Sequence, residues 1–251
     1  MPDSHNYPRI LNNNPMKFTS TTVVLLAILM SACSSENKEN TLSAKEKNTG
    51  WQLLFNGTST EGWHLYNRDS TTGQWIVKDG ELVCSPAPGK ELGDLVTNQK
   101  FSNYDLKFDW KISREGNSGV FVNVIERSDI PTAWASGPEY QLLEESHHDY
   151  QNELKRSGCL FGLSPQLKNV PLNPPGEWNQ SEIKQINGKV EFYLNGQLTI
   201  ARDFTTQGWK DSIANSNFKH FPEFGKSIVG QIGLQDWNKG VAFKNIKIRE
   251  L

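Results

Sequence analysis

The stretch that decides the fold is SEIKQI-NG-KVEFYL-NG-QLTIA, which runs from Ser181 to Ala201. It contains three short runs of β-branched, aromatic and alternating polar residues, separated by Asn187-Gly188 and Asn195-Gly196. Asn-Gly is the strongest short-range signal for a two-residue hairpin turn, because both central residues of that turn need positive φ. The stretch therefore predicts an antiparallel meander with strands at 181–186, 189–194 and 197–201.

The same pattern of short strands and turns extends over the chain from Trp51 onward. Asp79-Gly80 separates two alternating runs, and the run from Tyr104 to Ser113 alternates apolar with charged residues, which is typical of a strand with one wet face. Further strands are expected at 51–55, 75–78, 81–84, 120–125, 159–163, 227–234 and 241–248, and one or two helical turns at 209–218. Because strands and helices do not alternate, the sequence predicts an all-β fold, an antiparallel β-sandwich or jelly roll.

Composition limits the function classes. The 251 residues carry a net charge of -2, and lysine and arginine are dispersed rather than gathered in a run. A phosphate-binding stripe is therefore absent from the sequence, and nucleic acid is not an expected partner. The length fits one globular domain, whereas the oligomeric state is left open.

The N-terminus predicts a targeting segment. Residues 18–32 form an apolar region behind Met16-Lys17 and end in the small-residue pattern LMSA before Cys33. We interpret residues 1–32 as a signal region, with Met16 as the better start and lipoprotein-type cleavage before a lipidated Cys33. This predicts an extracytoplasmic protein, a periplasmic or outer-membrane-attached lipoprotein of a Gram-negative bacterium. An uncleaved anchor or ordinary secretion is the alternative.

Residues 33–49 are rich in Ser, Glu, Asn and Lys and poor in apolar residues, so they are expected to form a flexible tether before a single domain at 50–251. Within that domain the remaining cysteines are Cys84 and Cys159. The extracytoplasmic compartment permits a disulfide between them, but two buried free thiols fit the sequence equally well.

One stretch, GPEYQLLEESHHD at 137–149, combines acid and base groups with an apolar run. In an extended strand Glu139 and Gln141 share one face, whereas Glu144 lies on the other. A bulge near Leu142-Leu143 would bring Glu144 to the Glu139 face. We therefore predict the floor of an active site here; an edge strand with a solvated polar face is the alternative.

Several segments, taken in order, resemble the family known as domain of unknown function 1080, which is associated with 3-keto-glucoside lyases and 3-keto-2-hydroxyglucal hydratases. The segments span the chain from Gly50 to Leu251. They are Trp51–Gly57, Gly116–Phe121, Gly137–Leu143, Gly176–Asn179, Leu194–Gly196, Gly230–Asp236 and Phe243–Ile248. The resemblance implies a concanavalin-like jelly roll whose concave sheet holds a sugar, and an oxidised (3-keto) glucoside or disaccharide as the substrate.

The resemblance also bears on single residues. The acidic residue and the histidine that follow the Gln-Leu-Leu run in the family match Glu144 or Glu145 and His148. Two positions depart from the family: Trp237-Asn238 stands where His-Gly is frequent, and Asn123 stands where Arg is frequent. No catalytic role tied to those two positions is carried over.

Cleavage of a 3-keto glycoside by elimination needs a base for the C2 proton and a partner for the oxyanion at C3. We predict that His148 is the base, with Glu139 or Glu144 orienting it or sharing its role, and that Arg156 or Lys155 is the oxyanion partner. A divalent cation could replace the basic side chain, because Glu139, Glu144, His147 and His148 are suitable donors, but their spacing is no metal signature. A solvated histidine loop is the alternative.

Further residues are predicted to bind the sugar through stacking and amide hydrogen bonds. The candidates are Asn117, Gln141, Arg156, Trp178, Asn179, Gln235, Asp236 and Trp237. The segment Asn117-Ser118-Gly119 is interpreted as a turn, and Trp178 could instead be a packing residue.

Two other functions remain open at this point. The run Glu139 to Glu144 resembles the Glu-x-Asp-x-x-Glu strand of jelly-roll glucanases, which would make the protein a retaining glycoside hydrolase, although Gln141 replaces the middle carboxylate. A non-catalytic carbohydrate-binding lipoprotein could use the same sandwich and aromatic residues without any base.

Overall fold

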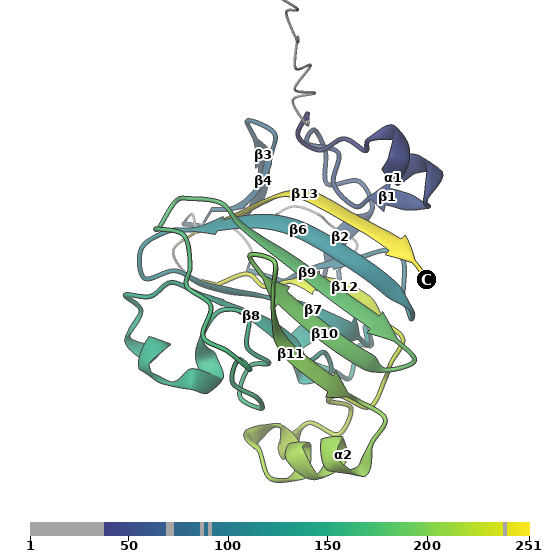
Figure 1. The fold of residues 1–251 in the computed structure, drawn as a ribbon, viewed down its shortest axis with the longest axis vertical. Coiled ribbons are helices and arrows are strands. Elements are labelled where there is room, and N and C mark those ends of the chain that lie inside the picture. The colour runs from purple at the N-terminus through teal and green to yellow at the C-terminus, as the bar shows by residue number, and fades with distance from the viewer. Residues whose placement is uncertain (1–37, 69–72, 86–87, 90–91, 238–239) are drawn as a thin grey trace, which may run out of the picture. The chain divides into compact units, whose positions relative to one another are not determined.

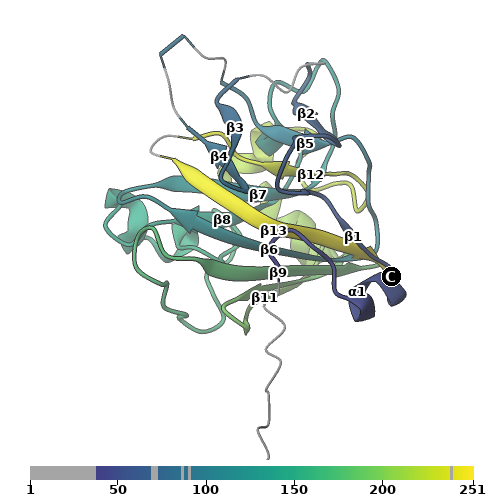
Figure 2. The same ribbon diagram turned by 90° about the horizontal axis from the view of Figure 1, so that it is seen from above.

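The computed structural model describes residues 38–68, 73–85, 88–89, 92–237 and 240–251. Strands within these ranges form two antiparallel sheets packed face to face (Figures 1 and 2). The larger sheet has the order β11-β10-β9-β6-β13-β4-β3, with β1 on β13, and the smaller has the order β2-β5-β12-β7-β8. This arrangement confirms the predicted all-β jelly-roll sandwich.

The elements have the following bounds. The strands are β1 (Trp51–Leu53), β2 (Trp63–Leu65), β3 (Trp75–Lys78), β4 (Glu81–Cys84), β5 (Leu95–Thr97), β6 (Tyr104–Ile112), β7 (Asn117–Val124), β8 (Glu139–Leu143), β9 (Asn179–Ile186), β10 (Lys189–Leu194), β11 (Gln197–Asp203), β12 (Gln231–Leu234) and β13 (Val241–Glu250). The helices are α1 (Ala44–Asn48) and α2 (Gln207–Ala214), with 3₁₀ turns η1 (Ala133–Ala135), η2 (His148–Gln151), η3 (Glu153–Lys155) and η4 (Asn217–His220).

The Asn-Gly turns act as predicted. Asn187 and Asn195 have φ of 51° and 47°, and the glycine after each has φ of 77°. These turns set the register in which β10 pairs with β9 on one side and β11 on the other. The meander that decided the all-β prediction is therefore confirmed.

The core lies between the two sheets, where inward side chains alternate with outward ones. On β6, Leu106, Phe108 and Trp110 are buried, and the charged residues between them face outward as predicted. Tyr140 of β8 enters this core from the smaller sheet and meets Phe108 edge-on, with ring centroids 5.8 Å apart. Burial of these large rings is the main favourable contribution to folding.

One buried hydroxyl joins the two sheets. Ser181 Oγ of β9 accepts a hydrogen bond from Trp110 Nε1 at 2.8 Å and lies 2.8 Å from Tyr140 Oη. Tyr140 also donates to the Tyr193 carbonyl at 3.1 Å. Strand β8 is thus held to the larger sheet through its one fully buried tyrosine, and this fixes which β8 side chains point away from the core.

Several expectations were wrong. Asn117, Ser118 and Gly119 form the start of β7 rather than a turn, and residues 159–163 form no strand, although Leu160 makes isolated bridges to Tyr140 and Ser164. Strands β2 and β5 were not predicted, because each has only three residues. Of the two alternatives for the thiols, the free state holds: Cys84 and Cys159 are buried and unbridged.

The start of the described chain also differs from the predicted tether. Residues 38–49 include α1, which begins with a capping box between Ser43 and Glu46. Glu39 and Glu46 form ion pairs with Lys244 and Lys247 of β13. The tether prediction for 33–49 is therefore wrong for residues 38–49, which are anchored on the larger sheet.

The centre of this anchor is a reciprocal asparagine pair. Asn40 N donates to Asn245 Oδ1 at 2.7 Å, and Asn245 N donates to Asn40 Oδ1 at 2.8 Å. Asn40 Nδ2 also donates to the Gly80 carbonyl at 2.8 Å. Both asparagines have φ of 53°, a conformation in which asparagine is favoured over other residues with a side chain. The pair therefore combines backbone and side-chain bonds that an alanine cannot replace.

The predicted signal region at 1–32, the start at Met16 and the lipidated Cys33 lie outside the described residues and stay predictions. Within the part of the chain that the structure describes, no helix is long and apolar enough to cross a membrane.

We predict that Asn40→Ala lowers the free energy of unfolding by about 2–4 kcal/mol, because it removes the two hydrogen bonds of the Asn40 side chain and leaves a non-glycine residue at positive φ. Asn245→Ala should act similarly, and the double variant should add little to either. Urea unfolding measures this, with the exposed α1 variant Lys45→Ala as the control. Additive losses in the double variant would contradict the reciprocal pair.

Candidate active site

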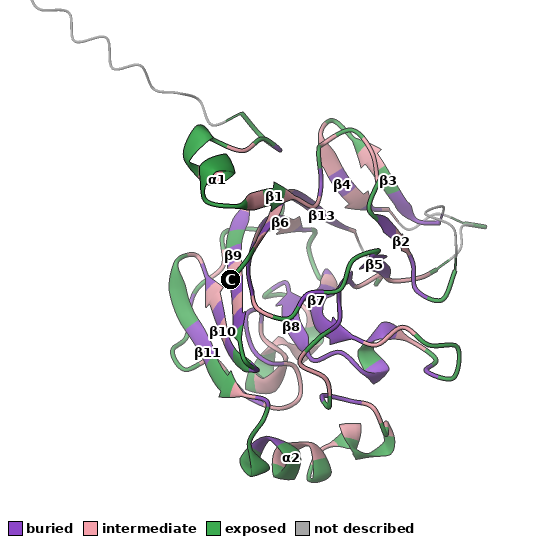
Figure 3. Cartoon of the chain, turned by 90° about the vertical axis from the view of Figure 1, so that its right-hand side faces the viewer, coloured by how far each residue is buried: buried purple, intermediate pink, exposed green. Residues whose placement is uncertain are grey.

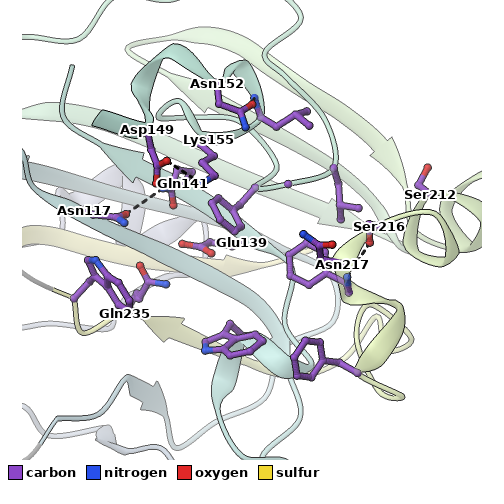
Figure 4. Close-up of a pocket in the computed structure, with 18 of the residues that line it drawn as sticks. Asn117, Glu139, Gln141, Asp149, Asn152, Lys155, Ser212, Ser216, Asn217 and Gln235 are labelled. Carbon is purple, nitrogen blue, oxygen red and sulfur yellow. Dashed lines mark hydrogen bonds and ion pairs between the residues drawn. The ribbon is translucent and has the colours of Figure 1, made fainter. Parts of the chain in front are cut away.

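A cleft of 880 Å³ lies over the face of the smaller sheet that points away from the core. Its floor is formed by Asn117 of β7, Glu139 and Gln141 of β8, and Gln235 after β12 (Figure 4). These residues share one face because β7 and β8 pair without a register shift, so that Gly119 lies opposite Gln141 and Phe121 opposite Glu139. Strand alternation that buries Tyr140 therefore turns Glu139 and Gln141 into the cleft.

Two further segments complete the cleft. The loop after β8 contributes Asp149, Asn152, Lys155 and Phe161, and the segment from α2 to η4 contributes Ser212, Asn215, Ser216, Asn217, Phe218 and Phe221. Trp134 of η1 and Trp237 stand at the rim. Figure 3 shows that α2 is largely exposed whereas β7 and β8 are largely buried, so a rigid floor meets a solvent-exposed wall.

Glu139 is the acid at the centre of the floor. Only 6% of its surface is exposed, and burial, followed by the negative charge of Asp94, raises the pKa of its carboxyl well above the usual glutamate value. With the Gln141 amide turned so that its nitrogen faces the surrounding acceptors, this nitrogen donates to Glu139 Oε1 at 2.8 Å and to the Ser118 carbonyl at 3.1 Å. Because its pKa is raised, this carboxyl holds a proton more tightly than an ordinary glutamate does, which is a property expected of a general acid or base.

The space occupied by Glu139 depends on a glycine. The carboxyl lies against the backbone of Gly119 on the neighbouring strand, where a Cβ atom would overlap it and would come within 2.7 Å of Glu139 Cδ. Gly119 is thus needed for close approach of the carboxyl rather than for a turn. This is the physical role of the residue that the sequence analysis assigned to a turn.

A charge pair stands above the floor. Lys155 Nζ lies 3.0 Å from Asp149 Oδ1, and this hydrogen bond, against a smaller opposing effect of burial, lowers the pKa of Asp149. Both side chains line the cleft (Figure 4). Lys155, one of the two oxyanion candidates, therefore places its ammonium group in the cleft, and its role toward a ligand stays a prediction.

Arg156, the other oxyanion candidate, does not line the cleft. Its Nε donates to the Tyr150 carbonyl at 3.0 Å and its guanidinium lies over the Tyr150 ring. The side chain of His148 is 83% exposed and is also absent from the cleft lining. The geometry thus favours Glu139 over His148 as the acid or base.

Glu144 is separated from Glu139. The predicted bulge at Leu142-Leu143 is absent, because the pairing of β7 with β8 continues in register and Glu144 N donates to the Gly116 carbonyl. Glu144 borders a smaller hollow of 280 Å³ with Pro174 and Asn179. Burial opposes ionisation of Glu144, but hydrogen bonds from Ser146 and from the Glu115 N–H outweigh it and lower the pKa of this carboxyl. Glu144 therefore holds its loop in place and forms no carboxylate pair with Glu139.

Trp178 and Asn179 also lie outside the cleft. The Trp178 ring packs against Lys111 and Lys244 on the outer surface of the larger sheet, with the ammonium groups 4.6 and 4.2 Å from its centroid. Asn179 is buried, and its Oδ1 accepts from Asn173 N at 2.9 Å and from Asn195 Nδ2 at 3.0 Å. Both residues stabilise the structure, which is the packing alternative considered for Trp178.

The segment after β12 lies between the cleft and a neighbouring hollow, and Gln235 and Trp237 line both. Gln235 lines the cleft, and Trp237, half exposed, stands at its rim. Asp236 instead borders the neighbouring hollow with Asp94, where its carboxylate accepts from Gly93 N at 2.8 Å and from Cys84 Sγ at 3.2 Å. Asn123 faces the sandwich interior and donates to Gln185 Oε1 at 2.7 Å, so it takes no part in the cleft.

One group of side chains could hold a metal ion. Ligand atoms of His147, His148 and Asp149 lie within 4.8 Å of one another at the start of η2. Two imidazoles and a carboxylate suit a divalent transition metal. Of the donors considered in the sequence, His147 and His148 belong to this group, whereas Glu139 and Glu144 do not.

Several cleft residues were not predicted. Trp134, Phe161, Asn217 and Phe221 come from irregular segments that carry no motif, and only their aromatic and amide character hinted at sugar binding. Their convergence depends on how loops far apart in the sequence fold over one sheet.

One face of this β-sandwich thus carries a buried acid, side-chain amides and aromatic side chains, a combination that is typical of a carbohydrate site. Comparison with known proteins gives the family: residues 50–249 match the model of the 3-keto-alpha-glucoside-1,2-lyase-like domain, and the chain belongs to this family. A 3-keto-disaccharide hydrolase of Bacteroides thetaiotaomicron is 29% identical over 80% of this chain and 79% of its own.

Two solved structures are also similar to this chain. A putative glycosyl hydrolase from Parabacteroides distasonis is 33% identical, with a TM-score of 0.79 over 85% of this chain and 100% of its own. A second putative glycosyl hydrolase from the same species, 24% identical with a TM-score of 0.61 over 80% of this chain and 99% of its own, shares the fold.

We predict that Gly119→Ala lowers the free energy of unfolding by about 1–3 kcal/mol, because the added methyl overlaps the buried Glu139 carboxyl. The matched control is Gly208→Ala, where a Cβ meets no atom within 4 Å and should add about 0.5–1 kcal/mol of helix stability. Urea unfolding measures both. Wild-type stability in Gly119→Ala would show that Glu139 does not need this space.

Proposed function

We propose that the protein cleaves glycosides that carry a ketone at C3, by removal of the C2 proton and elimination of the aglycone, and that it hydrates the resulting 3-keto-glucal. The observation that carries this proposal is the buried Glu139 carboxyl, with its raised pKa, at the floor of a polar and aromatic cleft. Membership of the family and the name of the curated relative support a keto sugar as the substrate.

The ketone determines what chemistry the protein must supply. A carbonyl at C3 acidifies the C2 hydrogen, so a carboxylate can remove it while the negative charge moves to the C3 oxygen. When the enolate collapses, the carbonyl re-forms, a double bond forms between C1 and C2, and the bond from C1 to the aglycone oxygen breaks. No oxocarbenium ion forms in this sequence, and a pair of carboxylates on opposite sides of C1 is not needed.

Glu139 is the proposed proton carrier. As a carboxylate it takes the C2 proton and becomes the acid that returns a proton to the departing aglycone oxygen, a role that typically contributes about 10²–10⁴-fold. Gln141 positions this carboxyl through its 2.8 Å hydrogen bond. Lys155 is the proposed partner of the charge that develops on the C3 oxygen, because its ammonium group lines the same cleft.

Hydration uses the same groups in reverse. Water adds to C1 of the glucal, Glu139 accepts a proton from that water, and C2 regains a proton, so that the sum of both steps is hydrolysis of the glycoside. A retaining hydrolase with Glu139 and Glu144 is not favoured, because the two carboxyls lie in different hollows. A non-catalytic binding protein is distinguished by activity.

The first test compares 4-nitrophenyl glucoside with its 3-keto form, following nitrophenol release and product mass. We expect release from the keto sugar alone, with an unsaturated keto sugar as the product, and a loss of about 10²–10⁴-fold in kcat for Glu139→Gln. Glu144→Gln should lose far less. Equal losses in both variants, or release from the plain glucoside, would favour the retaining hydrolase, and inactivity on the keto glucoside and the glucal would favour the binding protein.

The pH dependence of kcat/KM provides a second test. Because the charge of Asp94 helps to raise the pKa of Glu139, Asp94→Asn should lower that pKa and move the acid limb of the profile to lower pH. Burial raises the pKa of Asp94 itself to about 7, so the difference should be largest above neutral pH, where Asp94 is ionised. An unmoved acid limb in Asp94→Asn would show that Glu139 is not the titrating base.

A further inference from the structure

We propose that the segment from α2 to η4, residues 206–221, forms an aglycone subsite that accepts the second sugar of a disaccharide, with the Asn217 amide binding its hydroxyls. This inference rests on the proposed function in one respect, because it places the keto sugar over Glu139.

The cleft has room for more than the reacting sugar. Its 880 Å³ falls in the upper part of the range of roughly 300–1,000 Å³ that is typical of small-molecule sites. Figure 4 shows Glu139, Gln141 and Asn117 gathered in one part of the cleft, and Ser216 and Asn217 facing it from the opposite wall. A ligand that contacts both the acid and this wall therefore spans the cleft.

The polar groups of the wall differ in what they can offer a ligand. Asn215 Nδ2 donates to the Asp211 carbonyl at 2.9 Å, and Ser216 Oγ donates to the Ile213 carbonyl at 2.8 Å. Ser212 Oγ likewise donates within the helix. The side-chain amide of Asn217 lines the cleft and, among the described residues, makes no hydrogen bond, so its donor and acceptor are both available.

Aromatic side chains accompany this amide. Phe218, Phe221 and Trp134 also line the cleft, and Phe221 contacts Trp134. Aromatic faces pack against the C–H face of a sugar ring, while an amide binds its hydroxyls. An aryl aglycone would use the aromatic groups but would leave the Asn217 amide without a partner. The combination therefore fits a second sugar better than a flat apolar group.

The wall is held in a fixed position before any ligand binds. Phe218 stacks on Phe224 with centroids 3.9 Å apart, and Phe221 meets Trp134 edge-on at 4.7 Å. Behind them Trp209 stacks on Phe204 at 4.2 Å, and its Nε1 donates to the Gly225 carbonyl at 2.7 Å. A wall positioned by packing loses little conformational entropy on binding, which favours a specific subsite.

The test compares two keto substrates that share the reacting sugar: a 3-keto gluco-disaccharide and methyl 3-keto-glucoside. We expect Asn217→Ala to lower the ratio of kcat/KM for the disaccharide to that for the methyl glycoside about fivefold, which corresponds to one hydrogen bond between neutral groups. The matched control is Lys219→Ala, an exposed η4 residue outside the cleft, which should leave the ratio unchanged. An unchanged ratio in Asn217→Ala would overturn the subsite.

Binding of unoxidised sugars separates this inference from the proposed function. Wild-type protein and Asn217→Ala are titrated with maltose and with methyl glucoside, and NMR follows the binding. This gives the ratio of the two binding affinities without turnover. If wild type turns over neither keto substrate, the proposed function fails, but a fivefold loss of maltose preference still supports the subsite. Equal affinity of wild type for both sugars would overturn it, as would tighter binding of an aryl glucoside than of maltose with no effect of Asn217→Ala.

Discussion

The site depends on the way in which one tyrosine holds β8 in the sandwich. Tyr140 enters the core, meets Phe108 and shares Ser181 with Trp110 of the larger sheet. Slipping β8 by one residue would turn Glu139 into the core and Tyr140 into the cleft. The Glu139 carboxyl would then be buried among aromatic rings, and the large Tyr140 ring would be exposed. The hydrogen bonds at Ser181 make that slip costly, so the orientation of the acid follows from the packing of its neighbour.

Glu139 is the residue at which this arrangement lowers the stability of the fold. A buried carboxyl whose pKa is raised binds its proton more tightly in the folded than in the unfolded chain, so it removes stability as the pH rises from the usual glutamate range through the folded pKa. Below that range the carboxyl is protonated in both states and costs nothing by this route. Asp94 adds to the effect, because its own pKa is raised to about 7 by burial. Stability is thus lower above the folded pKa values of these two carboxyls than in acid.

The sequence predicted the local features well and the convergence of distant segments poorly. Asn187-Gly188 and Asn195-Gly196 define their turns through positive φ, and alternation along β8 correctly placed Glu139 with Gln141. The bulge was wrong because nothing in the local sequence reports the register of a partner strand. The α2–η4 wall was missed as part of the site because its position depends on the edge-on contact of Phe221 with Trp134, which is far away in the sequence, as well as on the stacking of Phe218 on Phe224.

Burial of Glu139 also weighs against a purely binding role for this cleft. A protein that only binds sugars gains from amides and aromatic rings, as Gln235 and Trp134 provide, and those groups do not require a desolvated acid. The Glu139 carboxyl is 6% exposed and lies against Gly119, and the negative charge of Asp94 disfavours its ionisation, so it lowers stability. It does not improve the recognition of sugar hydroxyls, for which an exposed carboxylate would be a better acceptor. Proton transfer is the task for which this environment is an advantage, since burial raises the pKa of the Glu139 carboxyl.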